Sequence, residues 1–206
     1  MRKEKLKELN SYLEELQTIK MARKDNNSFL TRLFGKKSFL TSETYECHIK
    51  CGRIVVREKL LKGKKEGSAA IIFALTKTGE VLLNVEPRVF TKETVSLGFP
   101  AGYIEPNETA EEGARRELLE EHGYQAEEMI LLDEFYQDEG CSSALNKIFL
   151  ALNSEKVAEQ HLDKDEIIRP FLCTYDEVLE LNKLGYFTGA NSKLAIERAK
   201  EYFKRR

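Results

Sequence analysis

Long hydrophobic runs are missing from this sequence of 206 residues. No window approaches the roughly 18 consecutive apolar residues that a membrane-spanning helix requires. The first residues are charged and lead into an amphipathic segment, which differs from the apolar core of a secretion signal. We therefore expect a soluble, cytoplasmic protein that does not act at a membrane. The sequence also contains no internal repeat and no low-complexity tract.

Cysteine is scarce as well, since the chain has only four: Cys47, Cys51, Cys141 and Cys173. These are too few for a disulfide scaffold, and a chain of this length can bury a core without a metal staple. Cys47 and Cys51 flank His48, but no second pair at zinc-finger spacing completes a metal site. Cys47, Ile49 and Cys51 alternate with polar residues, so we expect them to be small core residues of a strand.

The formal net charge of −2 conceals an uneven distribution. Residues 1–65 hold 17 Lys and Arg against 8 Asp and Glu, whereas residues 66–206 hold 16 against 27. The basic segment either complements the acidic remainder as a solvated surface or helps to hold an anionic ligand. Aromatic side chains are not interleaved with this basic charge, so the sequence does not support specific binding of nucleic acid.

The first 44 residues predict a helical extension followed by a linker. Within residues 2–24, apolar side chains recur at spacings of three and four, which is typical of an amphipathic helix. This stripe consists of Leu6, Leu9, Leu13 and Leu16. It needs a covering surface, either on its own chain or on a partner subunit as a short coiled coil. Residues 25–44 have the composition of a linker, with a short ordered piece around residues 29–34.

From Tyr45 onward the pattern changes, and we expect one domain over residues 45–206. Alternation and buried apolar runs predict strands at 45–58, 69–75, 81–85, 96–99, 128–136, 146–152 and 167–174. Helical patterns occupy residues 110–122, 175–183 and 192–204. Strands dominate the middle and helices flank them, so the sequence predicts an α+β sandwich with a mixed sheet.

The helix predicted at residues 110–122 carries the most informative residues. Thr109 and Glu112 have the spacing of a capping box, and Gly123 supplies a stop at the C-terminal end. At about 100° per residue, one broad arc carries the packing residues Ala110, Gly113, Ala114 and Leu118. Glu117 and Glu121 fall within the same arc, and Glu120 lies at its edge.

Unpaired carboxylates on a packing face cost several kcal/mol, so a positive charge must meet them. Arg116 lies beside these residues in the helix but points away from the centre of the arc. Carboxylates at positions i, i+3 and i+4 present hard oxygen ligands to one point, which suits Mg²⁺ or Mn²⁺. The tight apolar loop before the helix, residues 99–104, could add a free backbone carbonyl as a further ligand. The alternative, a solvated acidic face, fits Glu111 and Glu112 better.

These residues resemble a known motif, the Nudix box, Gly-x5-Glu-x7-Arg-Glu-U-x-Glu-Glu-x-Gly-U, in which U is a bulky apolar residue. The matching residues are Gly102, Glu108, Arg116, Glu117, Leu118, Glu120, Glu121, Gly123 and Tyr124. Every glycine and polar position agrees, and Tyr124 departs mildly from the usual aliphatic residue. The resemblance implies an α/β/α sandwich that hydrolyses a nucleoside diphosphate linked to a group X with the help of a divalent metal ion.

The same resemblance implies roles for individual residues. Glu117, Glu120 and Glu121 are expected to bind the metal ion, whereas Glu108 and Arg116 are expected to form a structural pair. The box follows Pro100-Ala101-Gly102, a feature of the branch that cleaves ADP-ribose and nucleotide sugars. In that branch the alanine carbonyl, here that of Ala101, is a metal ligand.

A later loop of that branch supplies a glutamate that assists the attacking water. Glu166 is the best match by position, with Asp165 and Glu139 as alternatives. Two departures weaken the assignment to the branch. Enzymes specific for ADP-ribose usually carry a proline downstream of the box, and the segment 136–140 has none. The segment 84–88 replaces a more basic segment of that branch, so Arg88 is the expected phosphate contact.

We therefore expect a Mg²⁺-dependent hydrolase, with Mn²⁺ as a substitute, that acts on a nucleotide-type small molecule such as ADP-ribose or a nucleotide sugar. Its products would be a nucleoside monophosphate and a phosphorylated X. The alternatives are a pyrophosphohydrolase of nucleoside triphosphates or dinucleoside polyphosphates, and a Nudix-fold binding module without turnover. Members of this branch are commonly dimers whose N-terminal strands reach the partner, so we expect a homodimer in which residues 1–44 contribute to the interface or cover the site.

Overall fold

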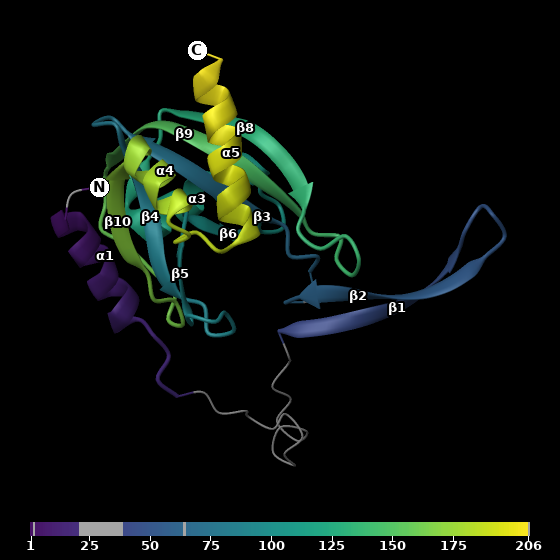
Figure 1. The fold of residues 1–206 in the computed structure, drawn as a ribbon. Coiled ribbons are helices and arrows are strands. Elements are labelled where there is room, and N and C mark those ends of the chain that lie inside the picture. The colour runs from purple at the N-terminus through teal and green to yellow at the C-terminus, as the bar shows by residue number, and fades with distance from the viewer. Residues whose placement is uncertain (2, 21–38, 64, 206) are drawn as a thin grey trace.

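The computed structural model of this chain describes residues 1, 3–20, 39–63 and 65–205 (Figure 1). Its centre is an eight-stranded sheet with the order β10-β4-β3-β9-β7, to which β5, β6 and β8 add by pairing with β4, β3 and β9. The strands are β3 (Ala69–Thr76), β4 (Glu80–Pro87), β5 (Val95–Gly98), β6 (Ala101–Tyr103), β7 (Tyr124–Gln125), β8 (Glu128–Tyr136), β9 (Leu145–Lys156) and β10 (Arg169–Thr174). Strands β3 and β9 run parallel while the other pairs are antiparallel, so the sheet is mixed, as predicted.

Helices cover both faces of this sheet, and strand β3 shows why. Its side chains alternate, so that Ile71 and Phe73 belong to one apolar cluster while Ala70 and Ile72 belong to the other. The helices are α1 (Lys3–Glu15), α3 (Ala110–His122), α4 (Tyr175–Lys183) and α5 (Ala190–Lys204). Helix α3 packs into the second cluster, and the other three pack into the first. The chain is an α/β/α sandwich, which confirms the predicted fold class.

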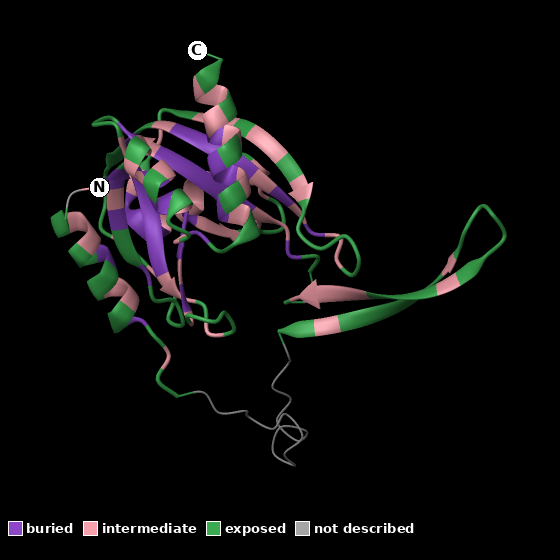
Figure 2. Cartoon of the chain, viewed as in Figure 1, coloured by how far each residue is buried: buried purple, intermediate pink, exposed green. Residues whose placement is uncertain are grey.

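Helix α1 lies against the body of its own chain. Leu9 is fully buried and Leu16 is 9% exposed, and both belong to the same cluster as α4 and α5. Figure 2 shows buried and half-buried residues among the exposed ones along this helix. Ion pairs reinforce this packing, with Lys5 Nζ 3.2 Å from a Glu177 oxygen and Arg169 Nη2 2.6 Å from a Glu15 oxygen. Leu13 packs against the same cluster, so the body of the chain itself covers three of the four leucines of the stripe.

The helix ends at Glu15, well before the predicted end at residue 24. The chain then leaves the helix so that the backbone N–H of Thr18 donates to Thr94 Oγ1 at 2.9 Å, a bond that a continuing helix would not permit. The short ordered piece predicted around residues 29–34 lies outside the described residues. No described helix is long and apolar enough to cross a membrane.

Two antiparallel strands, β1 (Leu40–His48) and β2 (Ile54–Lys62), form a hairpin that projects away from the sheet (Figure 1). The prediction of one strand over 45–58 was wrong, because the chain reverses at residues 49–53, where Gly52 adopts a φ of +85°. The expected core role of Cys47, Ile49 and Cys51 was also wrong. Cys47 is only half-buried, while Ile49 and Cys51 are exposed, since no other described element covers the hairpin.

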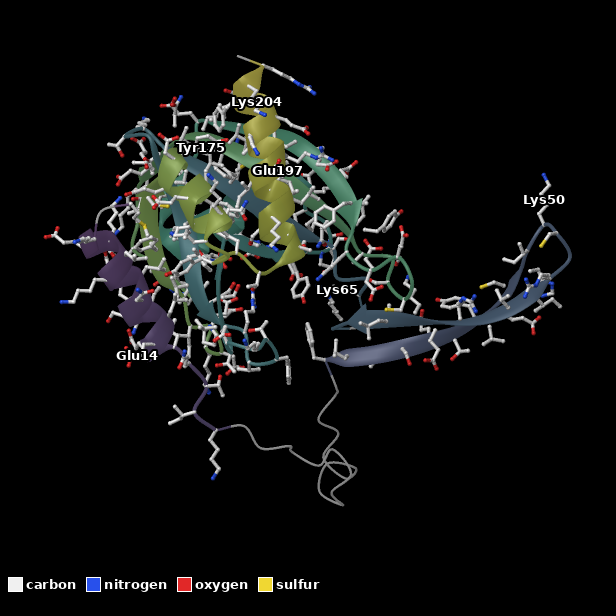
Figure 3. All side chains as sticks on the ribbon, in the orientation of Figure 1. Glu14, Lys50, Lys65, Tyr175, Glu197 and Lys204 are labelled. Atoms are coloured by element: carbon white, nitrogen blue, oxygen red, sulfur yellow. The ribbon has the colours of Figure 1, made fainter. Side chains whose placement is uncertain are left out.

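The base of the hairpin is tied to the body by a few contacts. The N–H of Leu60 donates to the carbonyl of Cys141 at 2.7 Å, and the Phe39 ring lies 6.1 Å from that of Tyr103. Beyond this base, both strands are largely solvent-facing, and Lys50 marks the tip (Figure 3). Strand β1 starts at Leu40, so the predicted linker ends sooner than residue 44.

Candidate active site

Helix α3 forms where the capping signals predict it. Thr109 Oγ1 accepts a hydrogen bond from the Glu112 N–H at 3.2 Å, and the Glu112 carboxylate accepts one from the Thr109 N–H at 2.6 Å. Gly123 ends the helix with a φ of +74°, and a Cβ there would lie 2.0 Å from the carbonyl oxygen of Ala158. Only glycine fits this close approach, and the result is a fixed helix whose last two turns carry the carboxylates of the box.

Arg116 holds the N-terminal side of the box together. Its guanidinium donates to both oxygens of Glu108, at 2.8 and 3.2 Å, and to the carbonyl of Tyr103 at 2.9 Å. This bidentate contact lowers the pKa of Glu108 below its usual value. The structure thus brings Glu108 and Arg116 together, and the pair ties the helix to the strand that precedes it.

The same guanidinium also reaches the expected metal ligands. Arg116 Nη1 donates to Glu117 at 2.7 Å and to Glu120 at 2.9 Å, a contact that its expected direction away from the centre of the arc did not suggest. The arginine side chain is long enough to bend back along the helix. Burial nevertheless raises the pKa of Glu117, because the loss of solvent outweighs the attraction of Arg116. A Cβ at Gly102 would lie 2.0 Å from the Glu117 carboxyl carbon, so the glycine of the box makes room for this carboxylate.

Glu121 has a different environment, because no described cation pairs with it. It is 4% exposed, and one of its oxygens accepts hydrogen bonds from the backbone N–H of Ala101 at 3.0 Å and from Asn84 Nδ2 at 3.1 Å. Burial, with the charges of Glu86 and Glu117, raises the pKa of Glu121 well above its usual value. The structure therefore holds a nearly dry carboxylate beside Glu117 and Ala101, as the predicted metal site requires.

A second layer of residues surrounds this carboxylate, and the sequence did not single them out. Asn84 lies on β4 and is 1% exposed, and its Oδ1 faces Nε2 of His122, which is 3% exposed. Burial lowers the pKa of His122 to about 4, so its ring is neutral at pH 7. One feature of the sequence could have pointed to this layer: Asn84 is a polar residue within the apolar run Val81–Val85.

Glu166 and Arg88 approach the box from two loops. The charge of Glu166 raises the pKa of both Glu86 and Glu117, which places it near them, and its carboxylate accepts a hydrogen bond from the Asp163 N–H at 3.1 Å. Arg88 Nη2 donates to Glu86 at 2.6 Å, and its side chain is 55% exposed. Glu86, itself largely buried, is thus a further carboxylate of this site that the sequence analysis missed. Of the two alternatives to Glu166, Asp165 is exposed in the same loop.

The other alternative, Glu139, is exposed in the loop between β8 and β9. The box itself combines a capped helix, an ion pair between Glu108 and Arg116, and the buried carboxylate of Glu121.

A family model described as the NUDIX domain matches residues 65–191, which is more than half of the chain. The chain belongs to the NUDIX family.

Relatives of this Nudix protein include an ADP-ribose pyrophosphatase of Bacillus subtilis (strain 168), which is 29% identical over 134 residues. The alignment covers 65% of this chain and 72% of that protein. A methanol dehydrogenase activator of Bacillus methanolicus is 28% identical over 132 residues, covering 64% of this chain and 70% of the relative. The first relative confirms the resemblance to the ADP-ribose pyrophosphatase branch.

Solved structures support the Nudix fold. The crystal structure of an ADP compounds hydrolase superposes with a TM-score of 0.71 at 23% identity, covering 82% of this chain and 89% of that one. A NUDIX hydrolase from Nitrosomonas europaea gives a TM-score of 0.51 at 21% identity, covering 66% and 88%. At these identities the likeness concerns the fold alone.

The residues of the Nudix box fit a divalent metal ion by their chemistry. Among the described residues, no three His, Cys, Asp or Glu side chains converge into a ready-made cation cage. Arg116 Nη1 instead bridges Glu117 and Glu120, while no described cation lies beside Glu121, whose pKa burial raises well above its usual value. Buried carboxylates of this kind are unfavourable alone and suit a hard cation such as Mg²⁺ or Mn²⁺.

A pocket of about 580 Å³ adjoins the box on the side of the hairpin. Its lining includes the aromatic rings of Phe39 and Tyr103 together with Lys62, Lys65 and Glu108. The Lys62 ammonium lies 5.6 Å from the centre of the Tyr103 ring. Aromatic faces and basic groups beside a carboxylate cluster can hold a flat ring and the phosphates attached to it.

Proposed function

We propose that this Nudix hydrolase cleaves the diphosphate of a nucleoside diphosphate linked to X, with ADP-ribose or a nucleotide sugar as substrate. The observation that carries the proposal is Glu121, a buried carboxylate with no described cation partner, placed beside Glu117 in an intact box. A retired site would have no reason to keep a carboxylate without a cation partner on a packing face. The similarity to an ADP-ribose pyrophosphatase supports the choice of substrate.

In this proposal the carboxylates of Glu117, Glu120 and Glu121 and the carbonyl of Ala101 hold Mg²⁺, with Mn²⁺ as a substitute. The ion, when bound, neutralises diphosphate charge and lowers the pKa of the attacking water. Arg116 shares its guanidinium between Glu108 on one side and Glu117 and Glu120 on the other. It thereby limits repulsion among these carboxylates and keeps their helix fixed against Tyr103.

Glu166 acts as the general base. Water attacks one phosphorus atom, the bridging P–O bond breaks, and the proton of the water passes to the Glu166 carboxylate. The products are a nucleoside monophosphate and a phosphorylated X. The proposal is supported by the charge of Glu166, which raises the pKa of Glu86 and of Glu117, two carboxylates of the site.

Arg88 and the pocket beside the box hold the substrate. The Arg88 side chain is more than half exposed beside Glu86. Burial raises the pKa of Tyr103, which lines the pocket, and the charge of Arg88 opposes this shift. A diphosphate between Arg88 and the helix would place the nucleoside over the rings of Phe39 and Tyr103. Its negative charge would draw the Arg88 guanidinium away from Glu86.

The experiment is a panel of nucleotide sugars, ADP-ribose, dinucleoside polyphosphates and nucleoside triphosphates, assayed with Mg²⁺ and with product identification. We expect the highest kcat/KM for an NDP-X compound, with a nucleoside monophosphate among the products. Preference for a triphosphate or a dinucleoside polyphosphate would replace the proposed substrate class. Tight nucleotide binding without turnover would instead indicate a binding module.

We also propose a cytoplasmic homodimer that is assembled through the hairpin. An isolated two-stranded hairpin is marginally stable in water, and this one exposes Ile54 at 57% and Val56 at 60%. A second copy could cover this apolar surface, since the hairpin begins at the wall of the pocket with Phe39 and Lys62. The division of the chain into residues 1–44 and 45–206 is likewise kept as a proposal.

Light scattering tests the dimer. Ile54→Asp with Val56→Asp should halve the mass and raise KM, because two carboxylates would be forced into the interface. Tyr136→Asp, which removes a 54% exposed ring from β8, is the matched control and should leave the mass unchanged. A double variant that keeps the wild-type mass would argue against this interface.

A further inference from the structure

Two buried polar residues behind Glu121 take no part in the proposed chemistry. Asn84 on β4 and His122 at the end of α3 are each at least 97% inaccessible to solvent. They come from different elements and meet directly behind the carboxylate that lacks a cation partner. Buried polar side chains are costly unless their hydrogen bonds are made, so their arrangement needs a reason.

The direction of the hydrogen bonds follows from elementary chemistry. Oε2 of Glu121 already accepts the backbone N–H of Ala101, so Asn84 turns its amide NH₂ toward the same oxygen, with Nδ2 3.1 Å from Oε2. The amide oxygen of Asn84 then faces His122 and can only accept as well. Nε2 of His122 must therefore carry the proton in this contact. A directed chain runs from the imidazole through the amide to the carboxylate.

This chain acts on one oxygen of Glu121. Both the Asn84 amide and the backbone N–H of Ala101 donate to Oε2, at 3.1 and 3.0 Å. Within the described part of the chain, no hydrogen bond reaches Oε1. Two donors on one oxygen fix the rotation of the carboxylate and leave the other oxygen free to bind a cation.

Packing alone does not explain His122. Its Nδ1 is buried and has no hydrogen-bond partner among the described residues, which costs about 1–3 kcal/mol. A leucine of similar size would fill the same space without this cost. The other ring nitrogen, Nε2, is the atom that gains from histidine at this position, because it can hold the Asn84 amide in one orientation.

We propose that Asn84 is a positioning residue for Glu121, and that His122 fixes the Asn84 amide so that Glu121 presents Oε1 to the divalent metal ion. The inference rests on the proposed function, in which Glu121 is a metal ligand. It adds two buried side chains whose hydrogen bonds join strand β4 to the end of helix α3. Such outer residues orient ligands, and their loss typically costs about 10–100-fold in metal affinity or activity.

The test is the affinity of the metal-free protein for Mn²⁺, measured by electron paramagnetic resonance without substrate. Asn84→Leu, or Asn84→Ala if the larger residue prevents folding, should weaken Mn²⁺ binding about 10–100-fold. Asn146→Leu is the matched control, since Asn146 is also 1% exposed but bonds to the Ala69 N–H and Gln137. It should lower the melting temperature and leave the Mn²⁺ affinity unchanged.

Two further measurements concern His122: the rescue of Mn²⁺ binding by a conservative variant, and the position of the imidazole proton in the wild type. His122→Leu should weaken Mn²⁺ binding by a smaller factor than Asn84→Leu, and His122→Gln should restore much of it, because a side-chain amide can also donate to Asn84. In the wild type, ¹⁵N spectroscopy of the imidazole should show the proton on Nε2. A proton on Nδ1 would reverse the hydrogen-bond chain and overturn the inference.

The two levels of the proposal fail differently. If the wild type binds Mn²⁺, Glu121→Gln loses it and the Asn84 variants keep it, the positioning role is wrong and the proposed function stands. If Glu121→Gln keeps both wild-type Mn²⁺ affinity and activity, Glu121 is no metal ligand, and the inference fails together with that assignment.

Discussion

The two sides of the Nudix box differ in how their carboxylates are neutralised. On one side Glu108 shares a bidentate contact with Arg116, and its pKa falls. On the other side Glu121 receives only neutral N–H donors, and its pKa rises. Both carboxylates belong to the same motif, and in the sequence only the resemblance to the Nudix box gave them different roles. In the proposed function, the carboxylate held by two guanidinium hydrogen bonds serves structure, and the buried carboxylate without a described cation binds the metal ion.

The largest loss of activity is expected when Glu121, the carboxylate without a described cation partner, is changed. Glu121→Gln removes a ligand charge without changing the shape of the side chain, and it should lower kcat/KM by about 10³-fold, since metal-ion charge stabilisation is worth several kcal/mol. Glu111→Gln is the control, because Glu111 lies on the exposed face of the same helix, paired with Arg115. Steady-state kinetics with saturating Mg²⁺ measures both. Wild-type turnover in Glu121→Gln would remove the metal assignment.

The next effect concerns a carboxylate outside the helix. If Glu166 is the base, Glu166→Gln should lower kcat by about 10²-fold while the Mn²⁺ affinity stays near that of the wild type. This separates loss of proton transfer from loss of metal. Asp165→Asn and Glu139→Gln are the comparisons, and a larger loss in either one would transfer the role of base to that residue.

Loss of the Arg116–Glu108 pair is expected to lower mainly the stability of the protein. Arg116→Ala leaves Glu108 and Glu117 without their partner and should destabilise the protein by about 2 kcal/mol, after allowance for the partial exposure of the guanidinium. That corresponds to a fall of roughly 4–8 °C in the melting temperature of a chain of this size.

Arg115→Ala, which breaks the exposed pair with Glu111, is the control for Arg116→Ala and should cost about 1 kcal/mol or less. Calorimetry of the two variants measures the difference. An unchanged melting temperature in Arg116→Ala, with activity lost, would move Arg116 to the chemical side of the comparison.

The sequence predicted the helix of the box better than its surroundings, and the reason is the range of the interactions. Capping by Thr109 and Gly123 is local, so the bounds 110–122 were confirmed. Alternation in residues 45–58 revealed strand character but not whether anything covers the strand, so Cys47 and Cys51 were misassigned to the core. The contacts of Glu121 with β4 join residues 37 positions apart, which no local pattern can reveal.

The smallest expected effect is the change with pH in the contribution of Glu121 to the stability of the metal-free protein. Because the pKa of Glu121 is raised on folding, its contribution to stability is greatest below the unfolded pKa near 4.5 and falls as the pH rises through the folded pKa. His122, whose folded pKa is about 4, acts in the opposite sense between pH 4 and 6.5. His122 is present in both proteins, so its contribution cancels from the difference in stability between Glu121→Gln and wild type.

With a chelator present, the melting temperature of Glu121→Gln should therefore exceed that of wild type by a margin that grows from pH 5 to pH 8. A margin that stays constant or shrinks with pH would mean that Glu121 is compensated in the folded protein, and the contrast with Glu108 would be lost.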